Sequence, residues 1–251
     1  LRLGARPRTE PLFQLLDRWT ESDGDNPWVA TDAARLAAVR ADRAAAATRY
    51  FASHAREWDA LRSLHVAESE VEAAIARALE DAAIGRLVDI GTGTGRMIEL
   101  FGARAEAALG IDRSPEMLRL ARAKLAEAGL DGTELRQGDM YSLPLASHSA
   151  DTVIIHQVLH YAQNPAAAVA EAARLLAPGG RLLIVDFAPH EREDLRSTDA
   201  HVRLGFADEA ILKHFEEAGL DGRVVEHLEG GELTVTIWLG LQPEARLRVV
   251  A

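Results

Sequence analysis

The chain has 251 residues, 48% of them hydrophobic and 27% charged, which suits one large domain or a domain with a small extension. It has no cysteine, which excludes disulfides, thiolate metal sites and cysteine nucleophiles, and it has no apolar run of the roughly 18 residues that a membrane span needs. The net charge is -11, and the residues after 62 carry 18 basic against 30 acidic side chains, which disfavours nucleic acid as a partner of the main body. We therefore expect a soluble, cytoplasmic protein without a membrane partner.

The first 80 residues are helical in character. Residues 11–19 follow an amphipathic helical pattern, residues 22–27 are turn-rich and indicate a linker, and the alanine-rich residues 33–47 have high helix propensity. The first residue is not methionine, which is consistent with a numbering that starts inside a longer gene product.

From Arg86 onward, short apolar runs alternate with helical stretches, a pattern typical of βαβ units. Strands are predicted at 87–90, 107–111, 133–137, 152–155, 181–187, 224–227 and 233–239, and helices at about 94–104, 114–128, 165–177 and 207–218. Ser114 before Pro115 indicates a helix N-cap, Gly129 a helix stop, and residues 178–180 a turn. Only residues 229–232 separate the last two strands, which predicts an antiparallel hairpin. The expected fold class is α/β, a seven-stranded mostly parallel sheet with an antiparallel last strand, preceded by an all-helical extension.

The first predicted strand ends in Asp89 and Ile90 and runs into the loop Gly91-Thr92-Gly93-Thr94-Gly95, after which a helix begins. Glycine permits backbone angles and close approach that a Cβ would forbid, and the start of a helix presents free N–H groups. A dinucleotide-binding loop requires a third glycine at its sixth position, where this chain has Arg96. The loop therefore predicts a ligand site but disfavours pyrophosphate.

Two further carboxylates follow the next two predicted strands. Asp112 ends the second strand about 20 residues after the loop, a position suited to accepting hydrogen bonds from ribose hydroxyls. Asp139 follows the third strand. Because the carboxyl ends of parallel strands meet at one edge of a sheet, we expect Asp89, Asp112 and Asp139 to converge there.

The segments 88–95, 111–112, 138–140, 151–160 and 176–184 together resemble class I S-adenosylmethionine (SAM)-dependent methyltransferases of the ubiquinone/menaquinone type. The resemblance covers about residues 86–241 and implies a Rossmann-like fold, SAM as cofactor and S-adenosylhomocysteine as product. It assigns the glycine loop to the methionine part of SAM, Asp112 to the ribose and Asp139 and Met140 to the adenine. The full predicted cofactor set is Asp89, Gly91, Thr92, Gly93, Gly95, Asp112, Arg113, Met117, Gly138, Asp139, Met140 and His156.

Two histidines after the fourth predicted strand are the candidate catalytic residues. Methyl transfer chiefly requires alignment and desolvation, so a catalytic side chain is not obligatory. His156 and His160 could each act as a base near neutral pH. The alternative is that they shape the pocket or cap the next helix.

Aromatic and histidine side chains complete the predicted acceptor side. Tyr161 and His190 are expected near the acceptor. Residues 201–206, which begin with His201, offer further polar candidates there, although Leu204 and Phe206 are typical of packing residues. The segment 50–59 resembles the lid of quinone and other small-molecule methyltransferases, which makes Tyr50 and Trp58 candidate ligand contacts, although aromatic residues at helical spacing also serve as simple core. The histidine and carboxylate spacings match no ligand pattern for a metal, and we expect no metal site.

A second resemblance concerns the N-terminal region. Residues 1–19 and 33–74 resemble the join in bacterial proteins that fuse an ArsR-type winged-helix regulator to a methyltransferase. The predicted organisation is a remnant of the winged-helix or dimerisation segment at 1–22, a helical linker and lid at 23–80, and the SAM-binding domain at 81–251. Two functions remain open: an enzyme that methylates a small-molecule acceptor, and a transcriptional regulator that senses SAM or S-adenosylhomocysteine. A homodimer is expected, and DNA is a partner only if a winged-helix domain lies upstream.

Overall fold

The structure is a computed structural model, and it describes residues 31–32, 34–36, 38–39, 67–130, 132–229 and 232–244. The chain divides into two compact units, Leu1–Ala45 and Ala46–Ala251. In the first unit the described residues are helical and exposed, in agreement with the helix expected from residue 33. The predictions for residues 1–22, the linker at 22–27 and the lid segment 50–59 lie outside the described residues, and the predicted domain boundaries remain predictions.

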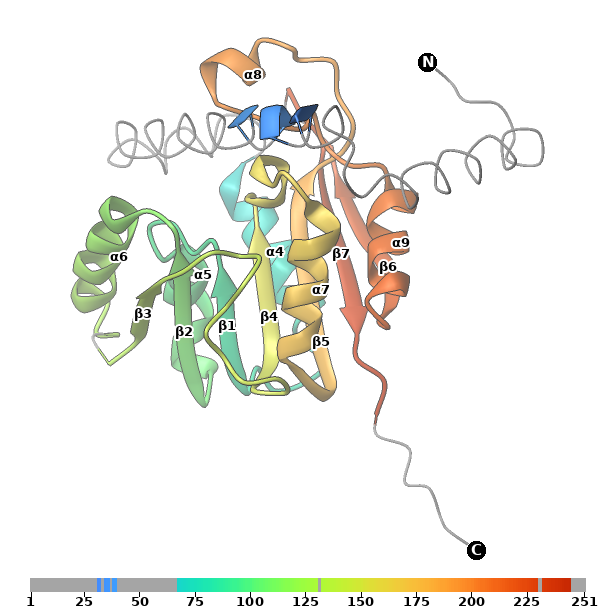
Figure 1. The fold of residues 1–251 in the computed structure, drawn as a ribbon. Coiled ribbons are helices and arrows are strands. Elements are labelled where there is room, and N and C mark those ends of the chain that lie inside the picture. Colours follow the sequence, from blue (N-terminus) through green and yellow to red (C-terminus); the bar gives the residue numbers. More distant parts are fainter. Residues whose placement is uncertain are drawn as a thin grey trace, which may run out of the picture. The chain divides into compact units, whose positions relative to one another are not determined.

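The second unit contains a seven-stranded sheet with helices on both faces (Figure 1). Its strands lie in the order β3-β2-β1-β4-β5-β7-β6. The elements are α4 (Glu68–Ala78), β1 (Arg86–Ile90), α5 (Arg96–Phe101), η2 (Gly102–Arg104), β2 (Ala107–Asp112), α6 (Pro115–Glu127), β3 (Glu134–Gln137), β4 (Ala150–His156), η3 (Leu159–Tyr161), α7 (Pro165–Leu175), β5 (Leu176–Phe187), α8 (Leu195–Thr198), α9 (Asp208–Glu217), β6 (Asp221–Leu228) and β7 (Val235–Leu241). This is the α/β, Rossmann-like architecture that the sequence predicts.

The direction of each strand follows from the length of its connection. β1 pairs in parallel with β2 and β4, β2 with β3, and β4 with β5. β7 is antiparallel to both β5 and β6, which confirms the predicted hairpin. Because β1 to β5 are parallel, their carboxyl ends lie at one edge of the sheet, where open α/β sheets bind ligands.

Two buried clusters hold the helices on the sheet. On one face, Ile75 of α4 and Met97 of α5 are buried with strand residues such as Ile154. On the other face, Val169 of α7 and Phe215 of α9 belong to a cluster that includes residues of β1, β4 and β5. In Figure 1, α7 lies in front of the sheet and α4 and α5 lie behind it. Both faces of the central strands are therefore covered, which explains their nearly continuous apolar sequences.

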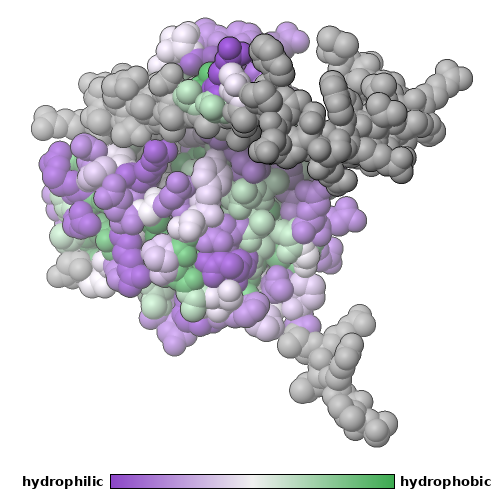
Figure 2. Space-filling model, in the orientation of Figure 1, coloured by the Kyte–Doolittle hydropathy of each residue, from purple (hydrophilic) through white to green (hydrophobic). Residues whose placement is uncertain are grey.

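The visible face of the described residues is largely polar. The view in Figure 2 is dominated by hydrophilic residues with scattered apolar ones, and Leu241 is the only large hydrophobic residue classed as exposed among the described residues of the second unit. Within the described ranges, no helix combines the length and the apolar character that crossing a membrane requires.

Local signals for the helix ends are confirmed at α6. The hydroxyl oxygen of Ser114 accepts the N–H of Met117 at 3.2 Å, and Pro115 is the first helical residue. Gly129, two residues beyond the end of α6, has a φ of 73°. Ser114 thus satisfies an N–H group that the helix itself cannot pair, and Gly129 provides the left-handed residue that ends many helices.

Several predicted boundaries differ from those of the structure, and the differences at α5 and between α7 and β5 have specific explanations. The helix expected from residue 94 begins at Arg96, because Gly95 has a left-handed φ of 87° and cannot belong to the helix. The turn expected at 178–180 lies within β5, and α7 ends at Leu175 instead of residue 177. Here Leu176 pairs with Ala150, and the N–H of Gly179 donates to the carbonyl of Gln242 at 3.1 Å. These two partners, which are distant in sequence, hold the segment in the sheet.

Candidate cofactor and acceptor site

The three glycines of the loop after β1 adopt left-handed backbone angles. The φ angle is 73° at Gly91, 54° at Gly93 and 87° at Gly95. Residues with a Cβ are disfavoured in this region, because the Cβ approaches a carbonyl oxygen. The N–H groups of Gly91 and Thr92 donate to the carbonyl of Ile111 at 2.7 and 2.9 Å, which fastens the loop to the end of β2. The sequence prediction that the backbone here requires glycine is consistent with these angles.

Asp89 closes the same loop from the side of β1. It is 2% exposed, and its Oδ2 accepts the hydroxyl of Thr92 at 2.6 Å. This bond ties the second residue of the loop back to the strand that precedes it. Asp89 therefore braces the loop, and its contact with a cofactor stays a prediction.

Asp112 joins the loop to the start of α6. Its Oδ2 accepts the N–H of Gly93 at 2.8 Å, and its Oδ1 accepts the N–H of Ser114 at 2.7 Å. Burial raises the pKa of the Asp112 carboxyl, and these two N–H groups act against that rise. Each carboxylate oxygen can accept more than one hydrogen bond. Asp112 can therefore hold the loop and still accept hydroxyl groups of a ligand.

The third carboxylate lies beyond β3. The N–H of Gly138 donates to the carbonyl of Asp112 at 3.0 Å, which brings this segment beside the end of β2. Asp139 is exposed, and its Oδ1 accepts the N–H of Tyr141 at 3.1 Å. Met140 is partly buried against the core. The end of β2 is thus hydrogen-bonded directly to both the glycine loop and the segment at Gly138. Asp89 of β1 is hydrogen-bonded to the same loop through Thr92.

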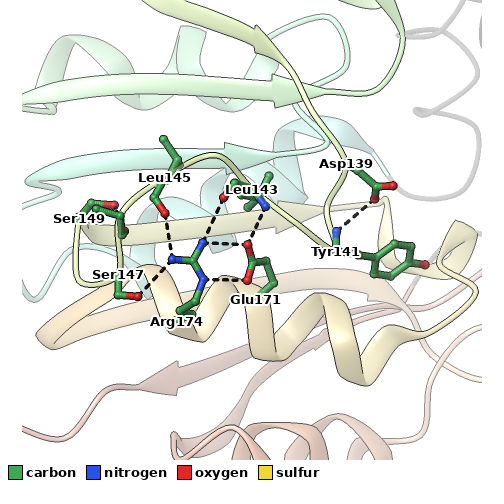
Figure 3. A network of polar contacts seen from close by, with 9 residues as sticks. Asp139, Tyr141, Leu143, Leu145, Ser147, Ser149, Glu171 and Arg174 are labelled. Carbon is green, nitrogen blue, oxygen red and sulfur yellow. Dashed lines mark hydrogen bonds and ion pairs between the residues drawn. The ribbon is translucent and has the colours of Figure 1, made fainter.

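The segment from Asp139 to Ser149 reaches β4 without a helix and is held by two residues of α7 (Figure 3). Glu171 accepts the N–H of Leu143 at 2.6 Å and pairs with Arg174. Arg174 donates to the carbonyls of Leu143 and Leu145 at 3.2 and 2.9 Å and to the hydroxyl of Ser147 at 3.2 Å. These charge-assisted bonds replace the support that a helix would provide. They position the segment that carries Asp139 and Met140.

The chain after β4 packs directly on the glycine loop. A Cβ built on Gly91 would lie 2.5 Å from Cγ2 of Val158, closer than real Cβ contacts occur. Between β4 and Val158, Gln157 is buried and has a left-handed φ of 50°, and its N–H donates to the carbonyl of Val185 at 2.7 Å. The residues that follow β4 are therefore neighbours of the candidate cofactor loop.

Comparison with known proteins agrees with this geometry. Residues 88–184, which run from the end of β1 into β5, match the family described as a methyltransferase domain. This part of the chain is a methyltransferase domain, in agreement with its resemblance to class I SAM-dependent methyltransferases. The cofactor of the family is SAM, as the sequence resemblance implies.

Several curated proteins are similar to the methyltransferase domain. An uncharacterized methyltransferase YcgJ of Bacillus subtilis is 32% identical over 126 residues, which is 50% of each chain. The phosphatidylethanolamine N-methyltransferase of Cereibacter sphaeroides is 35% identical over 116 residues, 46% of this chain and 57% of that protein. The ubiquinone/menaquinone biosynthesis C-methyltransferase of Syntrophotalea carbinolica is 40% identical over 118 residues, 46% of this chain and 49% of that protein. The chain thus spans about half the length of the curated relatives it matches.

A solved structure shows the same fold. The crystal structure of YcgJ from Bacillus subtilis superposes with a TM-score of 0.61 at 20% identity, covering 70% of this chain and all of that one. At this level of identity the likeness concerns the fold and leaves the activity open.

Three histidines lie close together beyond the carboxyl ends of β4 and β5. The ring of His160 lies 4.3 Å from that of His201, and His190 lies 6.3 Å from His201, measured between ring centroids. Phe187 stacks on His201 at 5.8 Å, and Tyr161 lies 4.0 Å from His160. The sequence prediction singled out His160, Tyr161 and His190, and the structure brings them together.

One residue of this group, Asp186, was not predicted from the sequence as a functional residue. Asp186 is fully buried and lies 2.8 Å from Nδ1 of His160 through its Oδ1. Its signal was present, because a charged residue within the apolar run of β5 needs a buried partner. His201 belongs to the polar stretch 201–206 that the sequence indicated, but its contact with His160 depends on how residues 188–206 return to the sheet.

The remaining predicted residues have different surroundings. His156 is buried at the end of β4, paired with Val185. Met117 is 1% exposed within α6, and the side chain of Arg113 is exposed. The roles predicted for these three residues toward the cofactor or acceptor stay predictions. Tyr50 and Trp58 lie outside the described residues.

Proposed function

We propose that the protein transfers the methyl group of SAM to a small-molecule acceptor. The observation that carries the proposal is the arrangement of Gly91, Gly93 and Gly95 in left-handed conformations with the Asp112 carboxylate bonded to the middle of their loop. Glycine main chain lets a ligand approach closely, and the spare acceptor capacity of Asp112 suits the two hydroxyls of a ribose.

The residues present fit an adenosyl amino acid as ligand. Asp112 would hold the ribose, and Asp139, whose carboxylate is exposed beside the same edge, would face the adenine amino group. Met140 would pack on the adenine ring, and the loop 91–95 would receive the amino-acid part. When bound, SAM supplies a methyl carbon activated by a sulfonium, so the protein has to align the acceptor and exclude water.

The names of two relatives support the proposed class of methyl acceptor. These relatives are named as a quinone C-methyltransferase and a phosphatidylethanolamine N-methyltransferase, which are names of enzymes with non-protein acceptors. A small organic acceptor, with a quinone-like molecule as one candidate, is therefore the proposal for this chain. The cytoplasmic location and the homodimer expected from the sequence remain predictions.

Calorimetric titration with SAM and with S-adenosylhomocysteine tests the cofactor site. We expect both to bind, and then a screen with tritium-labelled SAM over quinones, amines and catechols to find an acceptor. Absence of binding by both nucleosides would overturn the proposal. Binding without transfer to any acceptor would favour the second candidate function below.

The second candidate is a SAM- or S-adenosylhomocysteine-sensing regulator, and one contact favours it. Arg96, the first residue after the glycine loop, donates through Nε to Glu72 of α4 at 2.6 Å and through Nη1 to Glu99 at 2.8 Å. The ion pairs raise the pKa of Arg96, so its charge is permanent. The loop is thereby connected to α4, the helix that follows the N-terminal region.

A sensor requires that the nucleoside change the association of the chain. Sedimentation velocity with and without S-adenosylhomocysteine measures this, with Arg96→Met as the variant and Arg122→Met on α6 as its control. A nucleoside-dependent shift in association that Arg96→Met abolishes supports the sensor. An unchanged sedimentation coefficient in the wild type contradicts it.

A further inference from the structure

The carboxylate of Asp186 lies behind the ring of His160 at the carboxyl end of β5. Its Oδ1 is 2.8 Å from Nδ1 of His160, and Asp186 is fully buried. The same carboxylate accepts the main-chain N–H of His160 at 3.1 Å and that of Phe187 at 2.8 Å. These bonds come from two segments of chain, so they fix both the carboxylate and the direction of the imidazole ring.

This arrangement favours one tautomer of a neutral His160 ring. A carboxylate only accepts hydrogen bonds, so in the contact with Asp186 the donor is Nδ1–H and Nε2 keeps its lone pair. Nε2 is buried and has no hydrogen-bond partner among the residues that the structure describes. A buried acceptor nitrogen of this kind, backed by a carboxylate, is suited to receive a hydrogen bond and then a proton from a ligand.

The position of His160 relates this nitrogen to the cofactor loop. Val158, two residues earlier, lies so close to Gly91 that a Cβ on Gly91 would collide with it. The carbonyl of His160 accepts the N–H groups of Val202 and Arg203 at 3.2 and 3.0 Å, so the segment after β5 is fastened over the same turn. His160 therefore lies between the neighbourhood of the glycine loop and the segment 188–206.

The ring contacts of His160 indicate the kind of molecule that fits beside it. Tyr161, His201 and Phe187 lie at centroid distances of 4.0, 4.3 and 5.1 Å. Aromatic side chains of this kind favour an aromatic ligand by stacked and edge-on packing. A base oriented by a buried carboxylate serves an acceptor whose nucleophilic atom still carries a proton at neutral pH, as a phenolic hydroxyl does.

We propose that His160 accepts the proton of an aromatic hydroxyl acceptor, and that Asp186 is the positioning residue that holds His160 for this step. The inference rests on the proposed function. The acceptor oxygen bonds to the methyl carbon, the carbon–sulfur bond breaks with its electron pair left on sulfur, and the O–H proton moves to Nε2 of His160. The charge lost at the sulfonium reappears on the imidazolium beside Asp186, so no further reactant is needed.

The first test uses ¹⁵N NMR to measure which ring nitrogen of His160 is protonated, in the wild-type protein saturated with S-adenosylhomocysteine. We expect His160 to show a protonated Nδ1 and an unprotonated Nε2, and we expect catechol to shift the Nε2 resonance. The resonance is assigned by its loss in His160→Gln, with His214→Gln on α9 as the matched control. Asp186→Asn should abolish the Nδ1-protonated preference. A proton on Nε2 in the wild type, or no response to catechol, would overturn the inference.

The second test measures transfer of labelled methyl groups to catechol against pH. The titratable or charged residues around His160 are Asp186 of β5, Tyr161 of η3, and His190, His201 and Arg203 between β5 and α9. We expect His160→Gln to lower kcat by about 10²–10⁴-fold with little change in KM. The rate of the variant should recover as catechol itself ionises toward about pH 10. Asp186→Asn should lower kcat by at least about tenfold and His214→Gln should leave it unchanged.

The outcomes separate this inference from the proposed function. If the nucleosides do not bind, the proposed function fails and this inference falls with it. If they bind and the wild type methylates phenethylamine but not catechol, only the assignment of an aromatic hydroxyl acceptor fails. If His160→Gln keeps the wild-type kcat and pH profile, the role of His160 fails while the proposed function stands.

Discussion

The carboxylate of Asp112 holds the middle of the glycine loop, because its Oδ2 accepts the N–H of Gly93 at 2.8 Å. One side chain thus links the ends of two neighbouring parallel strands, β1 and β2. The bond explains how a loop rich in glycine keeps a defined shape despite its conformational freedom.

Asp112→Ala should weaken binding of S-adenosylhomocysteine by about 1–3 kcal/mol, because it removes an acceptor for ligand hydroxyls and leaves Gly93 without its partner. Isothermal titration calorimetry measures the change. Asp221→Ala, an exposed position at the start of β6, is the control and should bind normally. Wild-type affinity in Asp112→Ala would remove Asp112 from the cofactor site.

Gly91→Ala should lower the free energy of unfolding by about 2–4 kcal/mol, since a Cβ there combines overpacking against Val158 with a φ of 73°. Urea denaturation measures the loss. Val158→Ala removes most of the collision, so the double variant should lose less stability than the two single changes added together. If the stability lost by the double variant equals the sum of the two single losses, the collision with Val158 is not a cause of the loss in Gly91→Ala.

Arg174→Met should weaken binding of S-adenosylhomocysteine about three- to tenfold, or ~1 kcal/mol, although Arg174 is assigned no contact with the ligand. The reason is that the carbonyls of Leu143 and Leu145 lose their donor, which loosens the segment carrying Asp139 and Met140. Arg136→Met is the matched control, because Arg136 pairs with Glu134 on the exposed strand β3. Equal affinities of the two variants would contradict the positioning role.

Glu171 should make stability depend on pH in the acid range. The hydrogen bond from Arg174, and then the N–H of Leu143, hold the pKa of Glu171 below its ordinary value of 4.5 in the folded protein. The unfolded chain therefore binds the proton more readily, so the stabilisation is complete above pH 4.5 and is lost as the pH falls through the lowered pKa. Urea denaturation between pH 3 and pH 7 should show a shallower acid dependence for Glu171→Gln than for the wild type, and identical slopes would refute the assignment.

Local sequence signals were sufficient for the number and direction of the strands. The apolar runs alternating with helical stretches predicted the parallel strands, and the short connection at 229–232 predicted the reversed β7, because so few residues cannot cross the sheet. The glycine spacing predicted the loop, since left-handed angles at Gly91, Gly93 and Gly95 are a property of the local chain. The boundary near residue 94 was wrong because Gly95 is left-handed and cannot belong to the helix. The boundary near residue 176 was wrong because Ala150 and Gln242, which are distant in sequence, pair with this segment.

The remaining features required the tertiary structure, because they join residues that only strand pairing brings together. Asp186 contacts His160 because β4 and β5 are neighbouring strands. The ends of the two strands lie side by side, since His156 at the end of β4 pairs with Val185 of β5. Val158 meets Gly91 because β4 also lies beside β1. Periodicity and spacing describe one segment at a time, so they indicated which side chains could do chemistry, whereas the register of the sheet decided which of them are neighbours.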